Sequence, residues 1–428
     1  MASPGDRGEV APRWHPSPMA IAVNALGITQ ITAWGTSYYC LGVLASPIGS
    51  DLGWSRGFVF LGFTVSVLMM ALTSPWIGRL IDRVGARIVM SVGSLVIALG
   101  LLLLSWVTQQ WMYIAVWALI GIGMRCSLYD AAFAALVQVA PARGRQAISF
   151  LTLYGAFASS VFWVAGHYLE EAMGWRQALL VFAALNLTVC LPLHWFGLAQ
   201  REAQVAPAEA VSGGVGSGVL EGRARTVAMW LFALVMSLNG FVFGIVSVQL
   251  VPLLEAAGLA TAAAVWLASM KGVAQFVGRI VEISFGRNLS PMAIGRISIA
   301  VVPISFVLLH VSHGSLSVLL LFTLLMGASQ GVLTIVRGAV PLALFGAKGY
   351  GAVLGFIATP VLFVSAASPT IFAWLIDRWG WDVGHAAILV ASVASMVCME
   401  TMARWHRRGQ TDPDASTSAK EIRPTAGG

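Results

Sequence analysis

A chain of 428 residues in which 58% of the side chains are hydrophobic and only 10% are charged differs from soluble domains, where about 25% are charged. A net charge of +7 is compatible with a nucleic-acid partner. The arginines and lysines, however, cluster at the ends of apolar runs, where positive charge determines which side of the membrane a loop occupies. We therefore predict an all-α membrane protein embedded in the lipid bilayer, without a nucleic-acid partner, because long non-alternating apolar runs cross lipid as helices.

No metal site, cofactor or disulfide is expected. The four cysteines, Cys40, Cys126, Cys190 and Cys398, lie inside apolar runs without metal-type spacing. Residues 1–18 are short and polar, and the apolar run after them is too long for a cleaved signal.

Polar turns divide the chain into twelve apolar segments, each long enough to span a membrane. The first six are 19–46, 55–77, 87–107, 111–138, 147–169 and 175–198, and the second six are 227–254, 261–283, 293–311, 315–343, 350–374 and 381–404. Residues 199–226 contain the run Ser212–Gly218, which is typical of a linker. We predict a tail at 1–18, bundles at 19–198 and 227–404 joined by this linker, and a disordered polar tail at 405–428.

Positive charge crowds the predicted loops on one side of the membrane. The opposite side holds only Arg56, Arg176 and Arg378. The positive-inside rule makes the crowded side cytoplasmic, which includes both termini and the linker. We expect a monomer in the plasma (cell inner) membrane.

A charged turn occurs twice, half a chain apart. The copies Gly78–Arg87 and Gly278–Arg287 both begin with Gly-Arg, and each has an acid four residues after its first glycine. Gly-Trp pairs at 174–175 and 380–381 also stand before the sixth and twelfth segments. These repeats indicate two parallel repeats of six helices.

The first copy of this turn resembles the signature of the major facilitator superfamily, and the resemblance extends from about residue 19 to 404. The matching residues are Gly78, Asp82, Arg83, Gly85 and Arg87, while Ala86 stands where a basic residue is usual. The resemblance implies a twelve-helix transporter whose first, fourth, seventh and tenth helices line a central cavity.

Within the superfamily, the chain is similar to bacterial relatives of monocarboxylate and oxalate–formate carriers, chiefly through a cation in the eighth segment. The acidic-Gly-Trp signature of animal monocarboxylate carriers is missing, because the first segment reads Ile31–Tyr39 without it. Their substrate specificity is therefore not transferred to this chain.

The two turns are predicted to form a conformational latch. Their glycines allow helices to approach closely, and Asp82 is placed to cap a facing helix end in one state of the cycle. The predicted latch residues are Gly78, Asp82, Arg83, Gly85, Arg87, Gly278, Glu282 and Arg287. The alternative is that these charges only enforce topology.

Few ionisable residues lie deep inside the apolar segments: Arg125 and Asp130 near the middle of the fourth, Lys271 in the eighth and Arg337 in the cytoplasmic half of the tenth. Such placement costs about 2.5–3.5 kcal/mol, which makes them functional candidates. Arg125 and Asp130 are about 140° apart on a continuous helix and should not point together. Aligning the two halves puts Asp130 and Arg337 at one depth, so we hypothesise that they pair across the cavity and that Asp130 carries the proton. A permanent structural ion pair is the alternative.

The excess of cations over carboxylates favours a small organic anion as substrate, because arginine binds carboxylates bidentately. The predicted binding residues are Arg125, Lys271, Arg337, Gln30, Tyr38, Asn239 and Gln275. For Lys271, the alternative is that it snorkels or pairs near Glu282.

We therefore expect a secondary transporter of a mono- or dicarboxylate, coupled to protons or to a counter-anion, and no enzyme. The sequence lacks a phosphate-binding loop for ATP hydrolysis. One alternative is efflux of drugs or toxic oxyanions, although Gly155–Gly166 lacks the proline of the Gly-Pro motif that drug antiporters carry. The other is a membrane sensor that transports nothing.

Overall fold

The computed structural model describes residues 17–202 and 219–411, and every regular element in these ranges is a helix. The first half contains α1 (Pro18–Ala33), the π-helical η1 (Trp34–Tyr38), α2 (Leu41–Leu52), α3 (Arg56–Val84), α4 (Ala86–Ser105), α5 (Gln110–Ser127), α6 (Tyr129–Val139), η2 (Pro141–Arg143), α7 (Gly144–Gly155), α8 (Ala158–Leu185), η3 (Asn186–Cys190) and α9 (Leu191–Gly197). The second half contains α10 (Gly222–Ala256), α11 (Thr261–Phe285), η5 (Gly286–Asn288), α12 (Pro291–His310), α13 (Leu316–Phe345), α14 (Tyr350–Trp379) and α15 (Trp381–Thr411).

Nine helical stretches in the described ranges are long and apolar enough to cross a membrane. One of them, Pro141–Gly197, contains two helices joined across a kink at Gly174. Because this stretch crosses twice, the nine stretches supply ten crossings. The segment formed by α1, η1 and α2 and the more highly charged helix α11 supply the other two, which gives two bundles of six. The protein is therefore an all-α membrane protein, and its described ranges contain twelve crossing segments.

The Gly-Trp pairs form a repeated corner. Gly174 has φ 82° and ψ 162°, and Gly380, between α14 and α15, has φ 83° and ψ 175°. Only glycine adopts this backbone conformation without strain. The sequence repeat is thus a repeat of local structure.

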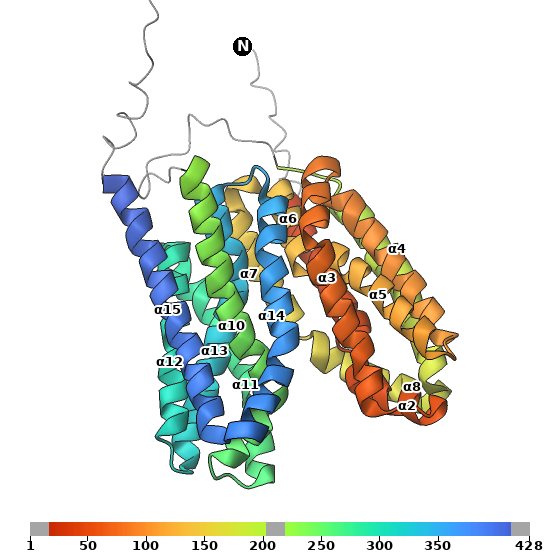
Figure 1. Ribbon diagram of the computed structural model, residues 1–428. Helices are drawn as coiled ribbons and strands as arrows, with labels where there is room; N and C mark the ends of the chain where they lie inside the picture. The colour runs from red at the N-terminus through yellow and green to blue at the C-terminus, as the bar shows by residue number, and fades with distance from the viewer. Residues whose placement is uncertain (1–16, 203–218, 412–428) are drawn as a thin grey trace, which may run out of the picture.

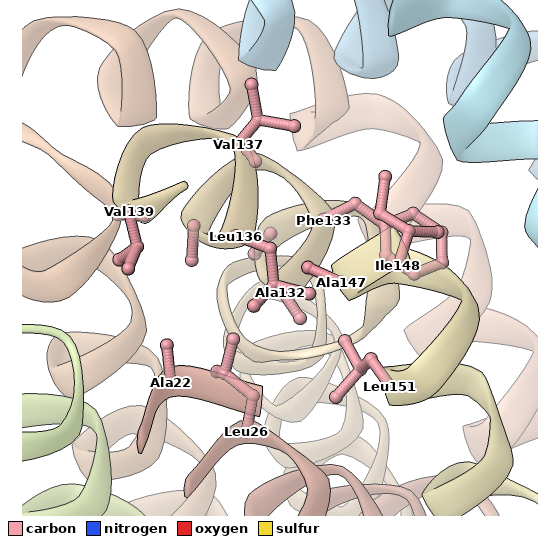
Figure 2. Close-up of a cluster of buried hydrophobic side chains, with 14 of the residues drawn as sticks. Ala22, Leu26, Ala132, Phe133, Leu136, Val137, Val139, Ala147, Ile148 and Leu151 are labelled. Atoms are coloured by element: carbon pink, nitrogen blue, oxygen red, sulfur yellow. The ribbon is translucent and has the colours of Figure 1, made fainter. Parts of the chain in front are cut away.

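The two halves meet at one end of the molecule, which we call the linker side because the described segments 199–202 and 219–221 lie there. Figure 1 shows the helices of the halves converging at this end, near α6, and diverging toward α2 and α8 at the other end, the far side. Figure 2 shows a buried cluster built from α1, α6 and α7. The same cluster includes Ile335, Ala339, Tyr350 and Leu354 of the second half. Apolar packing therefore joins the halves on the linker side.

Two predicted helices are interrupted inside the membrane. The segment predicted at 111–138 breaks at Leu128, which is extended with φ −83° and ψ −171° and separates α5 from α6. The segment predicted at 19–46 contains the π-helical turn η1 and ends at Leu52. The predicted 140° separation of Arg125 and Asp130 is therefore wrong, because the two residues belong to different helices.

The boundary predicted for the C-terminal tail also differs. Helix α15 continues through residues 405–411. No proline occurs between Trp381, where the helix begins, and Pro413, and extending an existing helix needs no new nucleus. Residues 412–428 and the tail at 1–16 lie outside the described residues.

Candidate functional site

Gln30 of α1 stabilises the break at Leu128, because it hydrogen-bonds to the backbone next to the break. The Gln30 amide nitrogen donates to the Ser127 carbonyl at 2.8 Å, and the Gln30 amide oxygen accepts from the Trp34 indole N–H at 3.1 Å. Gln30 is completely buried. Because both its polar atoms are used, this predicted substrate ligand instead joins the broken helix to η1.

Asp130 and Arg337 form an ion pair between the two halves. Nη2 of Arg337, on α13, lies 2.7 Å from Oδ2 of Asp130, in the first turn of α6. Asp130 is buried and its Oδ1 has no hydrogen-bond partner among the described residues, whereas the Arg337 side chain is 26% exposed. Arg337 is therefore the member of the pair that water or a ligand reaches.

Arg125, also predicted to bind substrate, is buried between α5 and α3. Its Nε donates to Ser74 Oγ at 2.6 Å, and its Nη1 has no hydrogen-bond partner in the described ranges. Asp130 and Arg337 both act on it electrostatically. Arg125 thus adds positive charge beside the ion pair without reaching the surface in this conformation.

Arg279 of α11 is a site residue that the sequence did not predict. It is buried, its Nη1 donates to the Thr152 carbonyl at 2.6 Å, and no described carboxylate pairs with it. Its charge acts on Tyr39 and Tyr129 of the first half. The available signal was its position inside the predicted segment 261–283, four residues before its end.

Lys271 lies elsewhere. Its backbone packs against Gly327, and its Nζ is 5.6 Å from the centre of the Phe243 ring. Gly327 precedes Arg337 by ten residues, about 15 Å along a helix. Lys271 is therefore not brought to the ion pair, and Glu282 does not pair with it either.

The other two predicted polar ligands serve packing. Asn239 donates to the Val235 carbonyl at 2.9 Å and to Ser395 Oγ on α15. Backbone atoms of Gln275 pack closely against Gly331. Neither residue contacts the ion pair.

Five aromatic side chains of the first half of the chain form a connected group, which we call the aromatic wall: Trp34, Tyr38, Tyr39, Phe63 and Tyr129. The Trp34 ring centre lies 4.8 Å from Tyr38, 5.9 Å from Tyr39 and 5.3 Å from Tyr129, and Tyr38 lies 4.8 Å from Phe63. All five are half-buried. Tyr38, a predicted ligand, is thus one ring of a continuous aromatic surface beside the charged groups.

A broken membrane helix at the interface between two repeats is typical of the binding sites of secondary transporters. The family model described as "Major Facilitator Superfamily" matches residues 26–324. The chain belongs to the Major Facilitator Superfamily. It is therefore a multi-pass membrane transporter.

Two solved structures share the fold of this superfamily member. The human organic anion transporter MFSD10 (TETRAN) is 16% identical with a TM-score of 0.69, and the match covers 90% of this chain and 100% of that one. The transporter FucP, in the outward conformation, is 12% identical with a TM-score of 0.66, covering 90% of this chain and 99% of that one. No curated protein matches the sequence.

The first charged turn of the transporter contacts the second half on the linker side. Asp82 accepts hydrogen bonds from the backbone N–H groups of Gly351 and Ala352 at 2.9 and 2.7 Å. These groups belong to the first turn of α14, where unpaired N–H groups and the helix dipole favour a carboxylate. A Cβ atom on Gly78 would lie 2.3 Å from the Gly351 carbonyl oxygen, so glycine permits this close contact.

The second turn makes a corresponding contact with the first half. Glu282 accepts from Arg145 Nη2 at 3.2 Å and from Ser149 Oγ at 2.9 Å, both on α7. Gly278 lets α11 pack against Ala328 of α13. Each half therefore offers one carboxylate to the other on the linker side.

The remaining predicted latch residues do not connect the halves. Arg83 is exposed and forms no hydrogen bond or ion pair in the described ranges, and Arg87 stacks 4.3 Å from the Trp195 ring of its own half. Gly85 provides the corner between α3 and α4 with φ 91°. The side chain of Arg287 lies outside the described part of the structure.

Proposed function

We propose that this transporter carries a small organic anion, a mono- or dicarboxylate, by alternating access with coupling to protons or to a counter-anion. The observation that carries the proposal is the Asp130–Arg337 pair between the halves, with Arg125 buried beside it and Arg279 buried against the carbonyls of Thr152 and Gly331. These groups comprise three guanidinium cations and one carboxylate. The excess positive charge in a site of low dielectric constant favours an anionic ligand.

We further propose that the linker side faces the cytoplasm of a plasma (inner) membrane, because arginine and lysine are concentrated there. The Asp82 and Glu282 contacts then close the cytoplasmic side, and the site is reached from outside. We expect the transporter to act as a monomer.

The ion pair suggests how anion binding is linked to a proton. A substrate carboxylate that binds Arg337 competes directly with Asp130, whose Oδ1 already lacks a partner in the described ranges. A buried carboxylate that loses its cation is stabilised by protonation. Asp130 would thus take up a proton when the anion binds and release it when the pair re-forms.

Replacing Asp130 with asparagine tests this link. The variant should retain anion exchange but lose proton-driven accumulation, since asparagine cannot release a proton. Both activities are measured in liposomes, the first as counterflow and the second as uptake under an imposed pH gradient. Asp51→Asn is the matched control, because Asp51 pairs with Arg176 away from the site. Unchanged accumulation by the Asp130 variant would refute the assignment of the proton carrier.

A further inference from the structure

The aromatic wall and the cations of the second half face each other across the site. Arg337 pairs with Asp130, the residue after Tyr129, and Arg279 donates to the Thr152 carbonyl of α7, three residues before Gly155, against which the Tyr129 hydroxyl lies. The rings come from η1, from Tyr39 directly after it, and from α3 and α6, whereas both arginines come from the second half. A molecule between the halves therefore meets aromatic surface on one side and guanidinium groups on the other.

The rings of the wall are not ordinary core residues. Phe133, which stacks on Tyr129 at 5.3 Å, is completely buried, and so is Tyr113 on α5. The five rings of the wall are all partly exposed although they lie within membrane-crossing segments. Their exposed parts are the surface that a ligand between the halves would contact.

Tyr129 marks the place for the ligand's charged group. Its hydroxyl is buried without a hydrogen-bond partner in the described ranges, and Arg279 has no described carboxylate partner. An unpaired buried hydroxyl is costly and is normally satisfied. A carboxylate bound at this end of the wall would accept from Tyr129 and neutralise a nearby guanidinium.

We propose that the substrate is an aromatic carboxylate, whose ring stacks on the aromatic wall while its carboxylate is held by Arg337, Arg279 and Tyr129. This inference rests on the proposed function and narrows it. Formate, oxalate and acetate present little or no apolar surface, so the wall would add nothing to their binding. A ring that covers about 100 Å² of apolar surface should raise affinity on the order of 10–100-fold.

The test compares inhibition of labelled benzoate uptake into liposomes by unlabelled benzoate, cyclohexanecarboxylate, acetate and oxalate. Benzoate should inhibit at concentrations about 10–100-fold lower than acetate, and cyclohexanecarboxylate should fall between them because it cannot stack. Direct binding of labelled benzoate to the purified protein provides a readout that does not need transport.

Variants of Trp34 assign the effect to the wall. Trp34→Leu should weaken benzoate binding about tenfold more than it weakens acetate inhibition. Trp34→Phe also loses the indole N–H that donates to Gln30 but keeps a ring, so it should retain most of the preference. Trp76→Leu is the matched control, since Trp76 is 64% exposed on α3 and belongs to no part of the wall.

The outcomes separate this inference from the proposed function. Transport of acetate and oxalate with no preference for benzoate would overturn the aromatic substrate and leave the anion transporter standing. A benzoate preference that survives Trp34→Leu would overturn the role of the wall. Uptake of a lipophilic aromatic cation, with no uptake of any carboxylate, would overturn both.

Discussion

Replacing Arg337 with glutamine should destabilise the transporter and abolish anion uptake, whereas the Asp130→Asn, Arg337→Gln double variant should regain stability without regaining uptake. The single change leaves the Asp130 carboxylate buried without its cation, and removing one member of a buried pair costs about 3–5 kcal/mol. The double change removes both charges, so the penalty disappears while the anion-binding group stays absent.

The measurements are thermal unfolding of the purified variants and uptake into liposomes. Arg296→Gln is the control for loss of an ion pair, because Arg296 pairs with Glu400 within one half and both side chains are about one-third exposed. Exposed pairs contribute little, so this variant should unfold near the wild-type temperature. Full uptake by the double variant would show that the pair is architectural only.

Replacing Gly78 with alanine should prevent closure of the linker side. The new Cβ would lie 2.3 Å from the Gly351 carbonyl oxygen, a backbone atom that no side-chain rotation can move away. Helices α3 and α14 must then separate, and the hydrogen bonds from α14 to Asp82 lengthen or break. We expect uptake to fall at least about tenfold, since a loss of 1.4 kcal/mol already changes an equilibrium tenfold.

Spin labels at Arg83 and Ala347, exposed positions in the two halves, would report the opening as a longer distance between the labels. Asp82→Asn should give a smaller shift in the same direction, because it removes charge but keeps an acceptor oxygen. Gly272→Ala is the matched control, since a Cβ atom there meets nothing within 4 Å. An unchanged label distance in Gly78→Ala would contradict a closing role for this contact.

Periodic and repeated features were predictable from the sequence. The twelve apolar segments follow from composition, and the two Gly-Trp corners follow from the duplicated pattern. The prediction that Asp130 and Arg337 lie at one depth also came from the repeat, because related helices place related positions at similar levels. The contact itself is present in the structure, while its function stays a proposal.

What the sequence did not predict depends on contacts between distant segments. The break at Leu128 has no proline or glycine at the extended position, and it is held by Gln30, almost a hundred residues earlier. Arg279 was interpreted as one of the charges on the cytoplasmic side that set the membrane orientation. Its burial could not be predicted, because it depends on a contact with Thr152 of the other half. Lys271 was predicted to be a site residue because the sequence shows that a charge lies inside a membrane segment, but it does not show at what depth in the membrane the charge lies relative to the ion pair.

The measurement that tests the central claim most directly is a thermal-shift screen of the purified transporter against carboxylates, inorganic oxyanions and lipophilic cations. A ligand that binds only the folded state raises the unfolding temperature, and the stabilisation grows as the logarithm of one plus the ratio of ligand concentration to Kd. We predict stabilisation by carboxylates in the wild type and none in the Asp130→Asn, Arg337→Gln double variant. Stabilisation by cations alone, or by carboxylates equally in both proteins, would contradict an anion site at Arg337.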